Sequence, residues 1–181
     1  MKNNQYAKDL KMGESIQFAN MVWSKFAEDH NRNAYMLADL YSHTMNFGED
    51  NNWKDSPIRY KLHKLYEKNI KEFGDGSIIT IQTDLFGHDG TRNYEKCEDK
   101  ISLLTYNLYR NNRDCIKKWG ISYWLLTPES TIYDYADNVM CVIPDGRISS
   151  CMCCYGNLAV RPFFILKHDT KLKEEYNVNR K

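Results

Sequence analysis

Three of the six cysteines in this 181-residue chain fall within four positions, as Cys151, Cys153 and Cys154. Thiols so close together could bind a metal ion or form a redox pair. A tetrahedral zinc site usually needs two Cys or Cys/His pairs that converge on one ion, and the sequence offers no second pair of that spacing. On a strand, Cys151 and Cys153 would face one side and Cys154 the other. The remaining cysteines are scattered, although one of them lies across the hairpin predicted below: Cys97, Cys115 and Cys141. We therefore expect small side chains that fill a strand, with zinc, or a redox or copper pair, as alternatives.

The other residues that carry chemistry do not form a recognised catalytic set. The five histidines are dispersed, and none lies four residues from another. The chain contains no Gly-x-Ser-x-Gly turn, phosphate-binding loop or dinucleotide-binding glycine motif. Acidic loops at 49–55 and 84–90 lack the ligand spacing of a calcium site. We expect no enzyme, no metal and no cofactor, and the sequence disfavours sugar binding.

Two polar loops have the composition of a recognition surface. They read STIYDYADN (130–138) and CCYGN (153–157). Tyrosine, serine, aspartate and asparagine on a β scaffold form the adaptable mixture that antibody paratopes use. The expected binding residues are Tyr133, Tyr135, Asp137, Asn138, Tyr155 and Asn157.

Composition and charge limit the class of protein. The formal net charge of +1 fits neither a polyanion that mimics nucleic acid nor a basic coat around it. The basic side chains of the helix expected at 56–73 alternate with acids, as on a solvated helix face. We expect a protein or nucleoprotein partner, and direct nucleic-acid binding stays open.

The chain carries no segment typical of a membrane or secreted protein. Its polar first fifteen residues lack the apolar run of a secretory signal, and no stretch approaches the ~20 apolar residues of a membrane helix. Cysteines in a chain without a secretory signal are typically free thiols in a reducing compartment. We therefore expect a cytoplasmic protein that does not contact a membrane.

The secondary-structure signals predict an α+β fold. Short strands are expected within 14–40, with a turn at Ala19-Asn20. Ser56 and Pro57 are a good N-cap and first residue for a helix that ends at Gly74. A second helix is expected from Tyr94 to about 111, because apolar residues recur there at helical spacing.

The second half of the chain reads as strands. Further strands are expected at 77–83 and 121–128, and 138–154 reads as a hairpin with Pro144-Asp145-Gly146 at its turn. A last strand, which closes the domain, is expected at 157–166. We expect a single domain over 1–167 and a charged C-terminal tail over 168–181, since the last residues lack a broad apolar face.

Four motifs, in this order, resemble a bacterial and phage domain family of unassigned function. They are WKDSPIRYKL (53–62), YWLLTP (123–128), DGR (145–147) and AVRPFFIL (159–166). The resemblance covers roughly 9–167 and departs at Leu126-Thr127, where the family usually has Arg-Ser. The family is similar to the C-type-lectin-like fold of phage tropism determinants and formylglycine-generating enzymes. Within that pattern we expect structural roles for Trp53, Arg59, Trp124 and Arg161, the arginines by donating to backbone carbonyls where the helix meets the closing strand.

A lone recognition domain without a catalytic set can act by covering a partner's surface. The resemblance includes phage and mobile-element members. We therefore expect a non-catalytic binding protein, most specifically a phage- or mobile-element-encoded inhibitor that binds a host protein or nucleoprotein in the manner of an anti-CRISPR protein. Two alternatives remain: a surface or virion module of the adhesin or tropism type, and a remote enzyme of the formylglycine-generating type.

Overall fold

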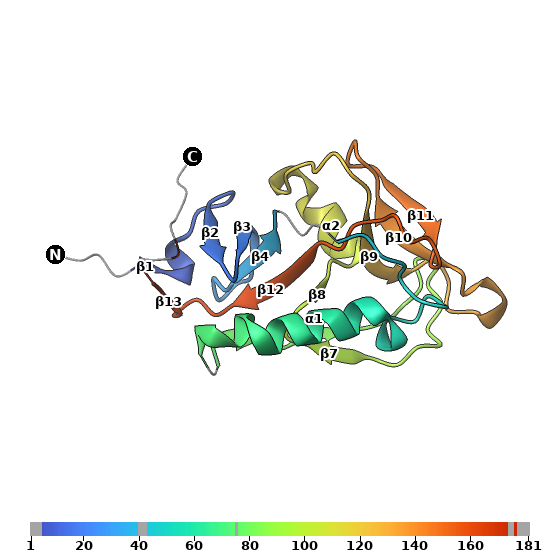
Figure 1. Cartoon of the computed structure of the whole chain (residues 1–181), viewed down its shortest axis with the longest axis horizontal. Helices are drawn as coiled ribbons and strands as arrows, with labels where there is room; N and C mark the ends of the chain where they lie inside the picture. The colour runs from blue at the N-terminus through green and yellow to red at the C-terminus, as the bar shows by residue number, and fades with distance from the viewer. Residues whose placement is uncertain (1–4, 40–42, 75, 174–175, 177–181) are drawn as a thin grey trace.

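The computed structural model describes residues 5–39, 43–74, 76–173 and 176. Its largest sheet has six strands, all paired antiparallel. The central strand comes from near the C-terminus and lies beside strands from the N-terminal part of the chain (Figure 1). In sheet order, five of the strands are β2 (Ser15–Phe18), β3 (Met21–Glu28), β4 (Ala34–Ala38), β12 (Pro162–Leu166) and β5 (Ile78–Ile79). The sixth strand, β8 (Ser102–Leu103), also pairs with the central strand β12.

The turn expected between the first two strands of this sheet is confirmed. Ala19 and Asn20 have φ values of 53° and 59°, in the left-handed region. Two consecutive left-handed residues match the twist of a two-residue hairpin. Beside this turn, Ile16 and Phe18 alternate with exposed residues and face the core, as the sequence pattern predicts.

A second sheet contains the hairpin that the sequence predicts. Its strands, in order, are β11 (Ile148–Met152), β10 (Asn138–Val142) and β9 (Tyr123–Pro128). The Pro144-Asp145-Gly146 turn is confirmed: the Ile143 carbonyl accepts the Gly146 N–H at 2.9 Å, and Gly146 has a φ of 86° that favours glycine.

Helix α1 (Pro57–Lys68) begins at the expected residues. The Ser56 hydroxyl accepts the Ile58 N–H at 3.2 Å, which satisfies one of the free donors of the first turn. A short 3₁₀ segment, η3 (Ile70–Phe73), extends the helix, and Gly74 ends it with a φ of 100°. Ile58 and Leu62 are fully buried, so the helix packs its apolar face on the core.

The prediction of a helix from Tyr94 to 111 is wrong in its first half. Helix α2 is Tyr106–Asn112, and its N-cap Thr105 accepts the Leu108 N–H at 3.1 Å. Residues upstream form β7 (Cys97–Asp99), which pairs with β6 (Ile81–Thr83). Ile101 and Leu104 are buried outside any helix, so their helical spacing was coincidental and Thr105 was the informative signal.

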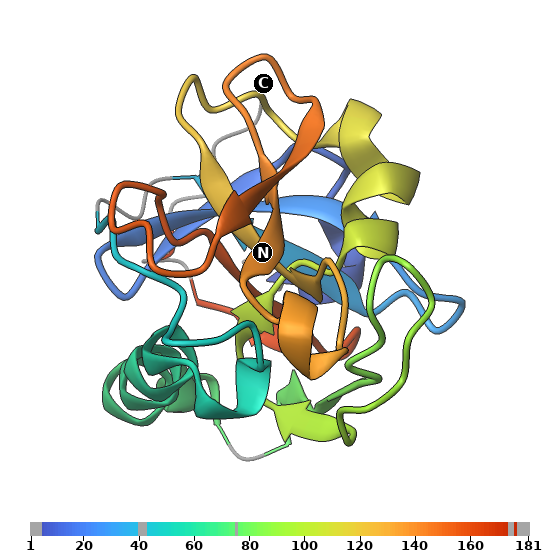
Figure 2. The same cartoon turned by 90° about the vertical axis from the view of Figure 1, so that its right-hand side faces the viewer.

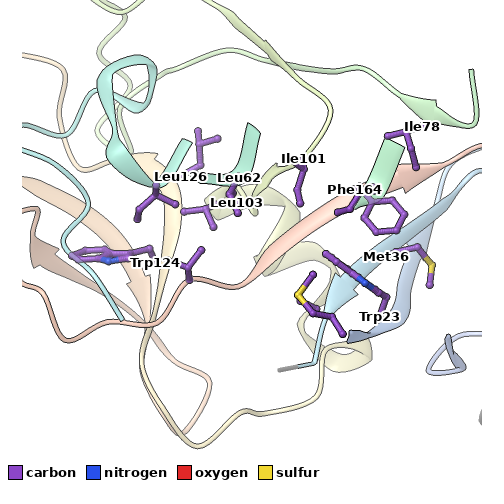
Figure 3. Close-up of a cluster of buried hydrophobic side chains, with 14 of the residues drawn as sticks. Trp23, Met36, Leu62, Ile78, Ile101, Leu103, Trp124, Leu126 and Phe164 are labelled. Atoms are coloured by element: carbon purple, nitrogen blue, oxygen red, sulfur yellow. The ribbon is translucent and has the colours of Figure 1, made fainter. Parts of the chain in front are cut away.

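Two hydrophobic clusters fill the molecule because strand residues alternate between them. Phe164 of β12 and Trp124 of β9 belong to the cluster beneath α1, together with Leu62 of the helix (Figure 3). Their strand neighbours Phe163 and Leu125 belong to the cluster that packs against α2. Strands β9 and β12 therefore bury both of their faces.

A buried carboxylate joins α1 to β7. The Asp99 side chain is 1% exposed and accepts hydrogen bonds from Trp53 Nε1 at 2.8 Å, Arg59 Nε at 2.8 Å and His63 Nε2 at 2.6 Å. Cys97 Sγ lies 3.5 Å from the same carboxylate. We call these five residues the Asp99 junction. Each oxygen of Asp99 has a donor, as a buried charge requires.

The two ends of the described chain pair with each other. Strand β1 (Gln5–Tyr6) pairs with β13 (Lys171–Leu172). Leu172 and Tyr176 are buried, and the Tyr176 ring packs edge-on against Phe18 with centroids 5.1 Å apart. Within the segment that we expected to be a charged C-terminal tail, β13 and Tyr176 thus contact the rest of the fold. Residues 174–175 and 177–181 lie outside the described part.

The fold is α+β, with mostly antiparallel sheets and two α-helices in the described residues, which confirms the predicted class. Among those residues, neither helix has the length and apolar content to cross a membrane.

Candidate functional site

The structure brings the two tyrosine-bearing loops together. The Cys153 N–H donates to the Asp137 carbonyl at 2.7 Å, and Asn138 lies opposite Met152 in the β10–β11 ladder. The first loop contains the 3₁₀ turn η5 (Tyr133–Tyr135), which projects toward the viewer in Figure 2. We call residues 129–138 and 152–157 the tyrosine surface.

Most of the predicted binding residues face solvent on this surface. Tyr133 is 92% exposed and Tyr155 is 50% exposed. Asp137 and Asn157 are also exposed, whereas Asn138 is half-buried in β10. The side chain of Tyr135 lies outside the described part of the structure.

Two apolar side chains on the surface were missed by sequence reasoning. Ile132 and Met152 are each 43% exposed. Ile132 directly precedes Tyr133, and Met152 lies three residues before Tyr155. The strand register and burial place Met152 facing outward at the end of β11. Clusters of large exposed apolar side chains are characteristic of interaction sites.

A buried asparagine holds the first loop in place. Asn51 is fully buried, and its Nδ2 donates to the carbonyls of Ser130 and Asn138, each at 2.9 Å. Its Oδ1 accepts the Tyr94 hydroxyl at 2.6 Å. Because Asn51 is 79 and 87 residues from its carbonyl partners, no local pattern could reveal this role.

A neighbouring loop braces the start of the tyrosine surface. The N–H groups of His88 and Asp89 donate to the carbonyls of Pro128 and Glu129, at 2.8 Å and 3.1 Å. Thr131 N–H donates to the Thr91 hydroxyl at 2.7 Å. These bonds leave the exposed side chains on a supported backbone, which lowers the entropy lost when a partner binds.

The tyrosine surface is acidic although the chain as a whole has a net charge of +1. Segments 129–142 and 148–160 contain no lysine or arginine. A hollow of about 470 Å³ on this face is lined by Ile132 and by four carboxylates: Asp89, Glu129, Asp134 and Asp137. Burial would raise the pKa of Asp89, but hydrogen bonds from Thr91 and Ser130 outweigh it and lower that pKa. Asp89 is therefore ionised at neutral pH.

The two residues of the closing motifs lie inside the fold. Trp124 is buried and donates to the Met45 carbonyl at 2.8 Å. Arg161 is 1% exposed and donates to the carbonyls of Ala38 and Lys117, at 2.9 Å and 3.1 Å. With Trp53 and Arg59 in the Asp99 junction, all four residues expected to be structural make hydrogen bonds within the fold.

The cysteines occupy three kinds of environment. Cys153 is buried directly after β11, Cys151 is half-buried within it and Cys154 is exposed. Burial raises the pKa of the Cys153 thiol, and neighbouring Cys154 and Asp137 add to the shift. Within the described residues, no three or more Cys, His, Asp or Glu side chains are grouped so that they could hold a metal ion.

A second hollow is lined by no described residue of the tyrosine surface. It measures about 790 Å³ and opens above Phe163 and Ile165 of β12, beside α2. His88 and Tyr106 form one wall, with ring centroids 4.4 Å apart. Its size and aromatic lining are those of a small-molecule pocket.

Comparison with known proteins gives one partial match. Residues 105–168 match the family model described as a domain of unknown function (DUF6273). The match includes α2, β9 to β12 and all of the tyrosine surface, and it is shorter than the 9–167 over which the sequence resemblance runs. No curated protein and no solved structure matches the chain.

Proposed function

We propose that this protein is a non-catalytic binding protein that contacts a protein partner through the tyrosine surface. The observation that carries the proposal is that four large side chains are exposed on two loops joined by the Cys153–Asp137 hydrogen bond: Ile132, Tyr133, Met152 and Tyr155. Tyrosine is enriched among the residues that dominate binding energy at protein interfaces. The carboxylates around the group favour a partner with a basic surface, because complementary charge speeds association and rejects other partners.

The absence of catalysis is part of the proposal. Burial raises the pKa of Cys97 to about 12 and also raises that of Cys153. At neutral pH these thiols stay protonated and are poor nucleophiles. Cys97 and Cys153 are therefore poor candidates for the reactive cysteine pair that a formylglycine-generating type of enzyme would need.

The more specific proposal is a cytoplasmic inhibitor encoded by a phage or mobile element, which covers the basic surface of a host protein or nucleoprotein. It rests on the sequence resemblance together with the acidic, apolar character of the tyrosine surface. A nuclease fits this description, because surfaces that bind nucleic acid are rich in lysine and arginine. The antiparallel sheets with flanking helices support a C-type-lectin-like fold as the scaffold.

The test is an affinity capture with three immobilised proteins. These are the wild type, the variant Tyr133→Ala/Tyr155→Ala, and Tyr60→Ala as a matched control. Tyr60 is 63% exposed on α1 and lies outside the tyrosine surface. We expect a protein from a lysate of the native host to bind the wild type and Tyr60→Ala but not the double variant.

The adhesin alternative predicts a different result. If the three proteins capture the same set of lysate proteins while the wild type alone is retained by a glycan array, the inhibitor proposal is wrong. The surface would then bind a carbohydrate.

A further inference from the structure

Two cysteines meet across the β10–β11 hairpin. Cys141 lies opposite Ser149 and Cys151 lies opposite Val139, so the two cysteines are diagonal neighbours on one face of the sheet. Their Sγ atoms are 2.8 Å apart. Both residues are free thiols in this structure.

The distance places the two sulfur atoms within reach of a covalent bond. A disulfide has an S–S length of about 2.05 Å, and its cysteines must lie on backbones that already approach each other. Here the hairpin ladder fixes both backbones, and the two Sγ atoms already lie 2.8 Å apart.

The two thiols differ in access to solvent. Cys141 is fully buried, whereas Cys151 is partly exposed. An oxidant arriving from solvent therefore meets Cys151 first. Cys141, held behind it, is placed to resolve the product.

We propose that Cys141 and Cys151 form a reversible thiol–disulfide site. With a small disulfide such as oxidised glutathione as the oxidant, the Cys151 thiolate attacks one sulfur atom and releases one glutathione thiol. The Cys141 thiol then loses its proton and attacks Cys151 Sγ, which releases the second glutathione thiol. Two protein thiols are oxidised and one glutathione disulfide is reduced to two thiols, so atoms and electrons balance.

The rate of ring closure depends on Cys141. Burial raises the pKa of its thiol, and the neighbouring Cys151 adds to the shift. Since the thiolate is the attacking species, we expect the second step to become faster as the pH rises. The site does not require that a partner bind the tyrosine surface.

The sequence permits a direct mass-spectrometric test. The purified full chain is incubated with oxidised glutathione, its remaining thiols are alkylated under denaturing conditions, and it is digested with trypsin. Cleavage after Arg147 separates Cys141, in peptide 119–147, from Cys151, in peptide 148–167. We expect the two peptides to be linked, with the loss of two thiols and two hydrogen atoms per chain. Dithiothreitol should restore both thiols.

Two variants separate the proposed pair from its neighbours. Cys153→Ser/Cys154→Ser removes the adjacent thiols and should still form the link. Cys151→Ser, at a half-buried position, should abolish it, and circular dichroism checks that this variant is folded. A thiol count that stays at its starting value would overturn the proposal. A link between these peptides that persists in folded Cys151→Ser would do so too.

Discussion

Carboxylates lie in opposite environments in the Asp99 junction and on the tyrosine surface. In the junction, a tryptophan, an arginine and a histidine converge on one carboxylate that is 1% exposed. On the tyrosine surface, tyrosines and carboxylates face solvent, and buried Asn51 bonds to the loop backbone at Ser130 and Asn138. The difference teaches that the residue type alone does not indicate whether a side chain is structural or available for binding. The structural side chains of the junction are themselves hydrogen-bonded inside the fold, whereas Asn51 bonds to the loop backbone of the tyrosine surface and leaves the exposed side chains available to contact a partner.

The largest expected effect comes from breaking the junction. Asp99→Ala leaves the Arg59 guanidinium and the Trp53 N–H without their acceptor. Removing one partner of a buried charge pair costs about 3–5 kcal/mol. We expect a loss of this order in the free energy of unfolding, measured by urea denaturation.

A surface ion pair close in sequence provides the control. Glu95 pairs with Lys54 at 2.6 Å but its side chain is 87% exposed. Glu95→Ala should leave the urea midpoint unchanged. Equal losses in the two variants would show that the junction is no more stabilising than a surface pair.

The next effect should appear in binding alone. Tyr133→Ala should weaken the affinity for the captured partner about 30-fold or more, since alanine substitution of an interface anchor costs about 2 kcal/mol or more of binding free energy. Its unfolding midpoint should match the wild type, because Tyr133 is 92% exposed. Surface plasmon resonance measures the affinity; a binding constant unchanged from that of Tyr60→Ala would remove Tyr133 from the interface.

A smaller effect should come from the carboxylates. Asp134→Asn/Asp137→Asn should slow association with a basic partner by about 3- to 10-fold and reduce its dependence on salt. The dissociation rate should change less than the association rate. If the double variant associated as fast as the wild type at low ionic strength, the charge of the surface would have no steering role.

The smallest effect concerns the pH dependence of the junction. Burial, Asp99 and the hydrogen bond to it raise the pKa of Cys97 to about 12, against 9.0 for a free thiol. The neutral thiol therefore contributes its full stability below pH 9, and that contribution is lost as the pH rises from 9 toward 12. Between pH 8 and 10, we expect the wild type to lose about 1 kcal/mol more than Cys97→Ala does. Identical pH profiles in urea denaturation would show that the folded-state pKa is not raised.

Local signals predicted much of the fold. Ser56-Pro57 marked the start of α1, and Pro144-Asp145-Gly146 marked the hairpin turn, because caps and turns depend on a few adjacent residues. The second helix was placed too early, since apolar spacing around Ile101 matched a helix while pairing with β6 decided the structure of β7.

The composition of the two loops pointed to the tyrosine surface, but its assembly could not be predicted. Contact between the loops depends on the Asp137–Cys153 hydrogen bond, and the position of the first loop depends on Asn51. These partners are far apart in sequence. Single-sequence reasoning therefore found the exposed tyrosines and missed Asn51, which holds their backbone.

The position of β12 in the largest sheet has a consequence for synthesis on the ribosome. Its neighbour β4 ends at Ala38, and β12 begins only at Pro162 (Figure 1). At a translation rate of about 5–20 residues per second, the edge of β4 stays unpaired for roughly 6–25 s before β12 is synthesised. During that interval the nascent chain presents an unpaired strand edge that carries Met36 and Leu37, the kind of edge that chaperones shield and that aggregation exploits. A ribosome that stalls before codon 162 would release a chain unable to complete its sheet.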